Sequence, residues 1–266
     1  MKPLLKWAGG KRWLAKKLVC QFPDKISRYI EPFFGSGAVF FEYRPEAAII
    51  SDANAALIEM YQAIRENPEK IYQQLQVLHM LHDKELYYKI RATVPGDPNE
   101  RAARFIYLNR TCWNGLYRVN KKNEFNVPIG TKSAVIFDDD DFCELSEQLK
   151  KAEISCCDFE ASISHAGAGD LIYVDPPYCK RDDNRGFLKY NRNVFSWRDQ
   201  IRLRDCLTEA RGRGAHIVLS NADSTCVRSL YEDGWTSYSV PRSSVISASS
   251  DFRVATTELV VTCHGG

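Results

Sequence analysis

Four consecutive residues, Asp175-Pro176-Pro177-Tyr178, have the types and the order needed to hold a planar amine. They follow the apolar run 170–174, which predicts a strand buried in a parallel sheet, with Asp175 at the carboxyl end where such sheets bind ligands. The two prolines fix the backbone and remove two donors, which leaves the Asp175 carboxylate and the Pro176 carbonyl as rigid acceptors. Tyr178 adds a flat face for stacking. This set suits the exocyclic amine of a nucleobase; the alternative is a turn that only ends a strand.

A second group of residues could bind a nucleotide-like cofactor. The sequence predicts a strand at 27–31 and Asp52 at the end of the next strand. The turn between them contains Gly35, Ser36 and Gly37 and opens a helix. This is the plan of a nucleotide-binding βαβ unit, in which glycines let the backbone approach the ligand and the acid accepts hydrogen bonds from a ribose. Only one basic group lies nearby in sequence, so S-adenosylmethionine, which has no triphosphate, fits better than ATP.

The amino-terminal stretch 6–11 contains two glycines followed by a lysine, which invites a phosphate-loop interpretation. That motif needs Gly at position 5 and Ser or Thr at position 12, where this chain has Leu5 and Arg12. What remains is a tight glycine turn that brings Trp7 near two lysines, with nonspecific packing as the alternative.

Composition places the chain among ordinary globular proteins. Its 266 residues are 44% hydrophobic and 26% charged, with a net charge of +2, which is enough apolar material for a sizeable core. The nine cysteines include no Cys-x-x-Cys pair and the five histidines are scattered, so no metal site is expected. The amino terminus is too short and polar for a signal peptide, and no membrane span is visible. We therefore expect a cytoplasmic protein without a membrane partner.

Basic residues concentrate in two segments. The segment 101–132 has seven basic residues against one acid, a net charge of +6, and the segment 180–204 has eight against three, a net charge of +5. Two such segments flanking 175–178 indicate a surface that meets a polyanion. The alternative is that nearby acids balance these faces in solvent. The acidic run 138–141 is interpreted only as a solvated loop.

The order of elements predicts an α/β fold interrupted by an insertion. Further strands are expected at 153–157, 171–174 and 216–220, a helix at 201–212, and a closing pair of strands at 235–240 and 258–262, separated by a mobile serine-rich loop around Arg253. Helical periodicity fills 55–92 and 101–109. We expect a catalytic domain of residues 1–54 and 146–266 and an inserted, mainly helical target-recognition domain of residues 55–145.

An enzyme that acts on a base amine in duplex DNA must extrude the nucleotide, because the stack hides that atom. Trp113, with Asn114 and Leu116, is well composed to fill the gap left behind, and the alternative is an aromatic core anchor. Arg118 could pair bidentately with a guanine in the major groove. Its alternatives are a phosphate contact and a surface ion pair.

The motifs together resemble the DNA adenine methyltransferase (Dam) family of N6-adenine enzymes, the D12 class. Seven matching stretches are spread over nearly the full length and lie in the order cofactor, insertion, catalysis. They are 6–11, 31–37, Asp52 with Asn54, 107–110, 114–118, 124–128 and 175–178. The resemblance implies a Rossmann-like, S-adenosylmethionine-dependent methyltransferase sheet.

The resemblance also assigns residues to roles. The S-adenosylmethionine site would be lined by Trp7, Lys11, Phe33, Gly35, Ser36, Gly37, Asp52, Asp158, Phe159 and Asp175. Catalysis would fall to Asp175, Pro176, Pro177 and Tyr178, with Asp175 and Tyr178 gripping the flipped adenine. A GATC-type site would be contacted by Lys6, Arg110, Trp113, Asn114, Leu116, Arg118, Asn126 and Pro128. Trp113 stands where the family has Tyr, and Thr131 stands where a basic residue is familiar, so a phosphate contact there is lost or passes to Lys132.

The sequence thus predicts transfer of a methyl group to the N6 amine of a flipped adenine in double-stranded DNA. Hydrogen bonds from the amine to Asp175 and the Pro176 carbonyl should make the nitrogen more tetrahedral, and no covalent enzyme intermediate is needed. The alternatives are an N4-cytosine methyltransferase, an RNA adenine methyltransferase, and a noncatalytic DNA-binding module. We expect a monomer associated with the nucleoid, with an orphan, restriction-linked or viral role all open.

Overall fold

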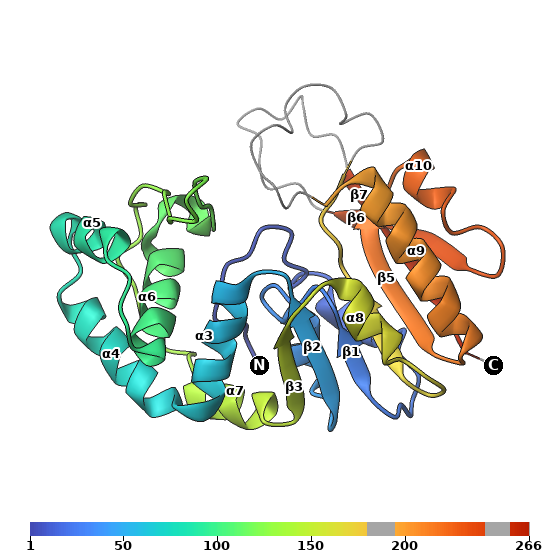
Figure 1. Cartoon of the computed structure of the whole chain (residues 1–266), viewed down its shortest axis with the longest axis horizontal. Coiled ribbons are helices and arrows are strands. Elements are labelled where there is room, and N and C mark those ends of the chain that lie inside the picture. The colour runs from blue at the N-terminus through green and yellow to red at the C-terminus, as the bar shows by residue number, and fades with distance from the viewer. Residues whose placement is uncertain (180–194, 243–255, 266) are drawn as a thin grey trace. The chain divides into compact units, whose positions relative to one another are not determined.

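The computed structural model describes residues 1–179, 195–242 and 256–265 and has the expected mixed α/β architecture (Figure 1). Its sheet is mostly parallel and has the strand order β3-β2-β1-β4-β5-β7-β6. The strands are β1 Tyr29–Glu31, β2 Ala48–Asp52, β3 Ala152–Cys156, β4 Leu171–Val174, β5 His216–Ala222, β6 Thr236–Arg242 and β7 Thr256–Cys263. The chain divides into two compact units. Unit 1 comprises residues 1–20 and 34–158, and unit 2 comprises residues 21–33 and 159–266.

Unit 1 contains β2 and β3, which pair in parallel, and most of the helices. Its helices are α1 Ala15–Val19, α2 Ala38–Tyr43, α3 Ala55–Glu66, α4 Pro68–Met80, α5 Lys84–Ala92, α6 Pro98–Thr111, the 3-10 turn η1 Trp113–Gly115, and α7 Phe142–Leu149. The apolar residues spaced along α3, including Leu57, Ile58 and Tyr61, are buried, as their helical spacing predicts.

The helices α3, α5, α6 and α7 of unit 1 begin at side-chain caps. The Asn54 side chain accepts a hydrogen bond from the Leu57 N–H at the start of α3. The Asp83 side chain accepts one from the Leu86 N–H at the start of α5. Asp97 caps α6, with Pro98 at the first helical position, where a missing N–H has no cost. Asp141 caps α7. Asp141 is exposed, as a solvated loop predicts. The interpretation of 138–141 only as a solvated loop is wrong for Asp140, whose side chain is 6% exposed and pairs with Arg110.

Unit 2 contains the other five strands. β1, β4 and β5 pair in parallel, and β7 then pairs antiparallel with both β5 and β6, which confirms the expected closing pair. All four residues of β4 are buried, as its unbroken apolar run predicts. Arg28 forms an ion pair with Asp170, with Nη2 and Oδ2 2.8 Å apart, directly before β4. This pair fixes the start of the strand that leads to Asp175.

The helices of unit 2 are α8 Phe159–Ser164, α9 Trp197–Gly212 and α10 Thr225–Arg228, and α9 runs alongside β5 (Figure 1). The helix expected at 201–212 begins four residues earlier, because Ser196 and Asp199 form a reciprocal capping box. No helix in the described ranges is long and apolar enough to cross a bilayer.

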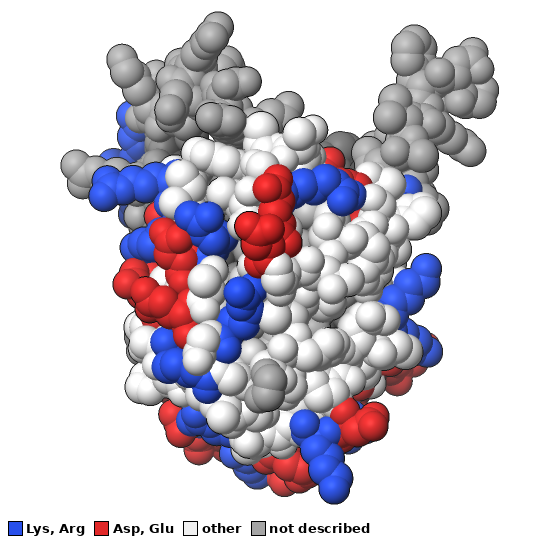
Figure 2. Space-filling model, turned by 90° about the vertical axis from the view of Figure 1, so that its right-hand side faces the viewer, with Lys and Arg blue, Asp and Glu red and all other residues white. Residues whose placement is uncertain are grey.

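The described part of the second basic segment supports the alternative of balanced charges. Arg202 pairs with Glu160 and Asp199, and Arg204 pairs with Asp205. On the face that Figure 2 presents, the described Lys and Arg residues are interleaved with Asp and Glu. Residues 180–194 of that segment and the serine-rich loop around Arg253 lie outside the described residues.

Candidate active site and nucleic-acid interface

In unit 1, the amino-terminal turn packs against the glycine loop. The Gly10 N–H donates to the Trp7 carbonyl at 3.0 Å and closes the expected tight turn. Gly35 has a φ of +48°, and a Cβ placed on it would lie 2.8 Å from Trp7 Cδ1. Both the left-handed backbone and the close contact therefore require glycine at this position. The Trp7 ring therefore connects the amino-terminal turn to the glycine loop.

The remainder of the loop is also tightly determined. Gly37 has a φ of +65° and stands at the N-cap of α2, where a Cβ would lie 2.6 Å from Phe34 Cζ. Ser36 is buried beside it. Lys11 is buried too, with its Nζ donating to the Gly9 carbonyl at 3.2 Å. These predicted cofactor residues form a compact group within unit 1.

Asp52 ends β2 and is held by backbone donors on both carboxylate oxygens. The Gly35 N–H donates to Oδ2 at 3.0 Å and the Asn54 N–H donates to Oδ1 at 2.9 Å. Burial raises the pKa of Asp52 above its usual value, against the lowering effect of these backbone donors. A carboxylate has further lone pairs to offer, so Asp52 can still accept hydrogen bonds from a ribose.

An aromatic stack joins Trp7 to the segment expected to recognise DNA. The Trp7 ring lies 5.5 Å from that of Tyr117 and 6.2 Å from that of Phe105, both in stacked orientation. Tyr117 is not among the predicted site residues, although its place between Leu116 and Arg118 in a matching stretch is a usable signal.

In unit 2, the four residues 175–178 follow β4 directly. The Ser220 hydroxyl lies 3.3 Å from Asp175 Oδ1 and 3.0 Å from the Tyr173 hydroxyl. Since a serine hydroxyl has one proton, Ser220 donates to Asp175 and accepts from Tyr173. The partly buried Asp175 carboxylate is therefore oriented by the adjacent strand β5, at the carboxyl end of a parallel sheet as predicted.

Tyr178 combines an exposed ring with an anchored hydroxyl. The residue is 43% exposed, while its hydroxyl donates to Glu258 Oε1 of β7 at 2.5 Å. Burial, and then the bond to Glu258, raise the pKa of Tyr178 well above its usual value, so the phenol stays protonated at every working pH. Pro176 is buried and Pro177 is exposed. The ring is accessible for stacking, and the backbone before it is rigid.

Two predicted cofactor residues of unit 2 form an aromatic cluster. Phe33 and Phe159 stack with ring centroids 5.4 Å apart, and Phe195 meets Phe33 edge-on at 5.6 Å. The Arg202 guanidinium lies 4.4 Å from the centre of the Phe159 ring. Asp158, which precedes Phe159 in the chain, is exposed.

The predicted recognition residues of unit 1 lie largely at the surface. Trp113 is 51% exposed and Leu116 is 42% exposed, so the alternative of Trp113 as a core anchor is wrong. Asn114 between them has a φ of +56° and is also exposed. Exposed large apolar side chains are uncommon enough to indicate a binding surface when they stand together.

Arg118 and Asn126 face each other across a short hairpin closed by the bridge between Val119 and Phe125. The Arg118 Nε donates to Asn126 Oδ1 at 2.8 Å, and both residues are predicted DNA contacts. Pro128, also predicted, is exposed. Its carbonyl accepts from the Trp113 N–H at 2.9 Å, which ties the far side of the hairpin to the exposed tryptophan.

Asn109 fastens the amino-terminal turn to this surface, a role that the sequence analysis did not assign. Its Oδ1 accepts from the Lys6 N–H at 3.0 Å, and its Nδ2 donates to the Lys6 carbonyl at 2.9 Å and the Gly115 carbonyl at 3.2 Å. The Lys6 side chain lies over Gly115, where a Cβ would be 2.7 Å from Lys6 Cδ. One buried amide therefore holds an exposed lysine beside the recognition residues.

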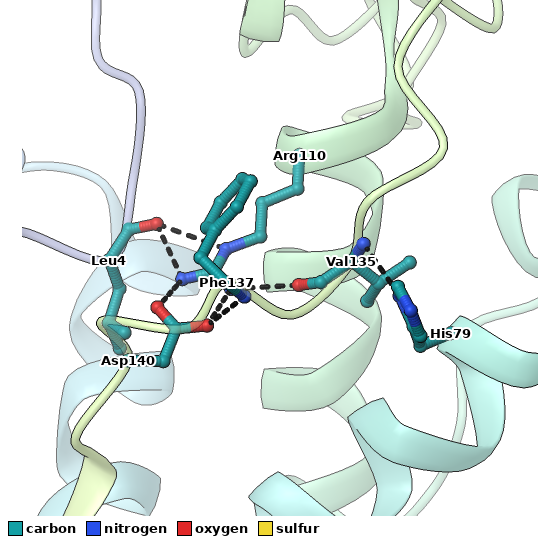
Figure 3. Close-up of polar contacts among 6 residues, drawn as sticks. All are labelled: Leu4, His79, Arg110, Val135, Phe137 and Asp140. Atoms are coloured by element: carbon teal, nitrogen blue, oxygen red, sulfur yellow. Dashed lines mark hydrogen bonds and ion pairs between the residues drawn. The ribbon is translucent and has the colours of Figure 1, made fainter.

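The prediction that Arg110 contacts DNA is wrong for this structure. Its side chain is 2% exposed, and it forms a bidentate ion pair with Asp140 and donates to the Leu4 and Val135 carbonyls (Figure 3). The guanidinium also lies 4.6 Å from the centre of the Phe137 ring. Five donors with protein acceptors leave nothing for a phosphate or a base. Arg110 instead joins α6 to the loop before α7.

The first basic segment is correspondingly less basic at its surface than its sequence suggests. Arg101 forms an ion pair with Glu59, and Arg104 donates to the carbonyls of Ile90 and Arg91. Together with Arg110, these arginines hold helices together. The exposed bases of the segment are Arg118, Lys121, Lys122 and Lys132.

Comparison with known proteins shows the family of the chain. Residues 7–246 match the model of the D12 class N6 adenine-specific DNA methyltransferases. The chain is 37% identical to the type II methyltransferase M1.LlaDCHI of Lactococcus lactis over all of this chain and 96% of that protein. It is 38% identical to the type II methyltransferase M.MjaIII of Methanocaldococcus jannaschii over 84% of each. It is 34% identical to the DNA adenine methylase of Haemophilus influenzae over 97% of this chain and 92% of that protein. The chain belongs to the D12 class of N6 adenine-specific DNA methyltransferases.

Proposed function

We propose that this methyltransferase moves a methyl group from S-adenosylmethionine to the N6 amine of an adenine extruded from duplex DNA at a GATC-type site. The observation that carries the proposal is the arrangement of residues 175–178. Two acceptors precede an exposed ring, and the Asp175 carboxylate and the Tyr178 hydroxyl are each held by a separate buried partner. Such rigid support is what a pre-organised site needs.

The chain's own groups act on the amine as acceptors and as a platform. The amine nitrogen shares its lone pair with the adenine ring and is a poor nucleophile. Asp175 and the Pro176 carbonyl accept hydrogen bonds from its two N–H groups. These bonds favour a more tetrahedral nitrogen, whose lone pair is then available to attack the methyl group. Tyr178 stacks on the base and excludes water from one face. When bound, S-adenosylmethionine supplies an electrophilic methyl group.

The residues of the glycine loop fit such a cofactor in chemical type. Asp52 is a partly buried carboxylate with lone pairs for a ribose diol, and Gly35 brings backbone close to the Trp7 ring. In unit 2, the half-buried Phe33 offers an aromatic ring suited to an adenine, and the buried Phe159 stacks against it. No phosphate-binding loop precedes α2, and a ligand without phosphates needs none.

Recognition is assigned to the exposed surface that contains Trp113, Leu116 and Arg118. We propose that Trp113 and Leu116 fill the gap left by the extruded base and that Arg118 reads a guanine. Asn126 holds the Nε of Arg118, which leaves the two terminal nitrogens to face a base edge. Residues 55–145 act in this proposal as the target-recognition domain, and the enzyme works as a cytoplasmic monomer on nucleoid DNA.

The test combines methyl-labelled S-adenosylmethionine with defined substrates. Duplexes containing GATC, each single-base change of it, and an unstructured RNA of matching sequence are incubated with the protein, and the modified nucleosides are identified by mass spectrometry. We expect N6-methyladenine in duplex DNA, with GATC preferred. Methylated cytosine, a preference for RNA, or DNA binding without transfer would each overturn the proposal in favour of one alternative.

The Asp175→Ala variant tests the role of residues 175–178. We expect loss of transfer with DNA affinity within about tenfold of wild type, because in this proposal the extruded base is the one part of the DNA that the carboxylate contacts. Asp138→Ala, an exposed acid of unit 1, is the matched control and should retain full turnover. Wild-type turnover by Asp175→Ala would refute the assignment.

A further inference from the structure

A buried carboxylate lies in the middle of the antiparallel part of the sheet in unit 2. Glu258 of β7 is 2% exposed and pairs with Ala222 of β5 and Val240 of β6. The next three residues along the strand, 259–261, are fully buried and apolar. An acid at such a position is costly unless its oxygens are hydrogen-bonded. Its presence calls for a specific partner.

That partner includes the hydroxyl of Tyr178. The phenol donates to Glu258 Oε1 at 2.5 Å, although the two residues are 80 apart in the chain. The ring of Tyr178 is thereby fixed at two places: its backbone follows two prolines, and its far end is bonded to the sheet. A tyrosine has only two side-chain torsions, so both are determined by these two constraints. An exposed aromatic ring without the second constraint would rotate between rotamers.

We propose that Glu258 is a positioning residue that holds the Tyr178 ring in the orientation required to stack on the extruded adenine. The inference rests on the proposed function of residues 175–178 and deepens it. Asp175 is oriented by Ser220 of β5 and Tyr178 by Glu258 of β7, so each half of the base-holding corner has its own support on a different strand. Glu258 touches neither base nor cofactor in this role, and it acts through the phenol.

The experiment compares Glu258→Gln, Glu258→Leu and Tyr178→Phe with wild type. Glutamine keeps an acceptor of the same shape, leucine removes it, and phenylalanine removes only the hydroxyl. Thr262→Val is the control, because Thr262 is a buried polar residue four positions further along the same strand, on the same face. Circular dichroism and thermal unfolding establish that each variant is folded. Turnover and KM are measured for both substrates.

A photochemical crosslink reports directly whether the Tyr178 ring stacks on the target base. A duplex with 5-iodouracil in place of the target adenine crosslinks to an aromatic side chain stacked on that base, and mass spectrometry identifies the residue. We expect Glu258→Leu to reduce both kcat and the crosslink at position 178 by about tenfold or more, with KM for S-adenosylmethionine within about twofold of wild type. Tyr178→Phe should reduce kcat in the same way. Glu258→Gln should recover at least half of the wild-type values, and Thr262→Val should match wild type.

The outcomes that would contradict the inference are as follows. Wild-type kcat and crosslinking in a folded Glu258→Leu would overturn it, as would Glu258→Gln being as defective as Glu258→Leu. If Glu258→Leu does not fold, a Tyr178→Phe variant with wild-type kcat overturns it alone. A loss in Thr262→Val equal to that in Glu258→Leu would show general damage to the sheet. Failure of the proposed function is seen separately, as a wild-type protein that transfers no methyl group to duplex DNA.

Discussion

Two arginines eight residues apart show how little residue type says about role. Arg110 is 2% exposed and bonded to Asp140 and two carbonyls, whereas Arg118 is exposed on a hairpin and donates from Nε to Asn126. Both stand in stretches that match the family, and both could have contacted DNA. The side-chain environment separates a structural arginine from a candidate for base recognition.

Arg110→Ala should destabilise the protein strongly. Removal of the guanidinium leaves the buried Asp140 carboxylate without its partner, which costs about 3–5 kcal/mol of unfolding free energy. Urea denaturation measures this loss, and Arg118→Ala serves as the control with unchanged stability. An unfolding free energy within about 1 kcal/mol of wild type would contradict the structural role of Arg110.

Arg118→Ala should instead relax sequence preference. Loss of a bidentate contact to guanine costs about 1–3 kcal/mol of discrimination at one base pair. Competition between a GATC duplex and duplexes with single changes measures the effect, with Arg118→Lys expected to be intermediate. Unchanged discrimination in Arg118→Ala would remove Arg118 from the proposed recognition set.

At the scale of elements, the glycine loop shows what sequence patterns can predict. The order of strand, turn, helix, strand and terminal acid could be predicted from the sequence. Buried strands, a glycine-containing turn and an acid at the end of a strand each have a distinct sequence pattern. The reason that Gly35 must be glycine was not readable, because it depends on Trp7, which lies 28 positions away in the chain. Likewise, the acid at 258 stood beside an apolar run, but only the sheet register brings it to Tyr178.

Gly35→Ala tests that packing. Alanine at a φ of +48° is strained by about 1–2 kcal/mol, and its Cβ would displace the Trp7 ring. We expect a lower melting temperature and weaker binding of S-adenosylmethionine by calorimetry. Gly96→Ala is the control, since a Cβ there meets nothing within 4 Å. Equal cofactor affinity in the two variants would mean that the loop tolerates a side chain and that the proposed cofactor site lies elsewhere.

At the scale of the whole molecule, the fold class and the positions of the strands along the chain were predictable, and the division into compact units was not. The strands β4 and β5 are buried on both faces, and their unbroken apolar runs therefore predict buried strands of a parallel sheet. The helices α7 and α8, of eight and six residues, were missed because they are too short for a clear periodicity. The boundary between the units depends on contacts that no local pattern reports, and the predicted inserted domain at 55–145 stays a prediction.

Stability should fall as the pH drops below about 6.5, the usual pKa of histidine. Burial lowers the pKa of His82, whose Nδ1 lies 2.8 Å from the Tyr107 hydroxyl. The unfolded chain therefore binds a proton at a higher pH than the native one, and acidification favours unfolding through this window. Urea unfolding measures the unfolding free energy between about pH 7.5 and 5.5. This free energy should fall less steeply with decreasing pH in His82→Asn than in wild type. The exposed His165→Asn is the control, and identical profiles for wild type and His82→Asn would contradict the assignment.

The buried amide of Asn109 has a consequence for engineering this enzyme. It bonds main chain at Lys6 and at Gly115, segments separated by more than a hundred positions. A block 113–128 taken from a relative carries the proposed recognition residues but would meet the host's asparagine and amino-terminal turn instead of its own. The unit of exchange between such enzymes is therefore discontinuous and includes residues 6 and 109, and a chimaera that exchanges 113–128 alone should misplace its lysine.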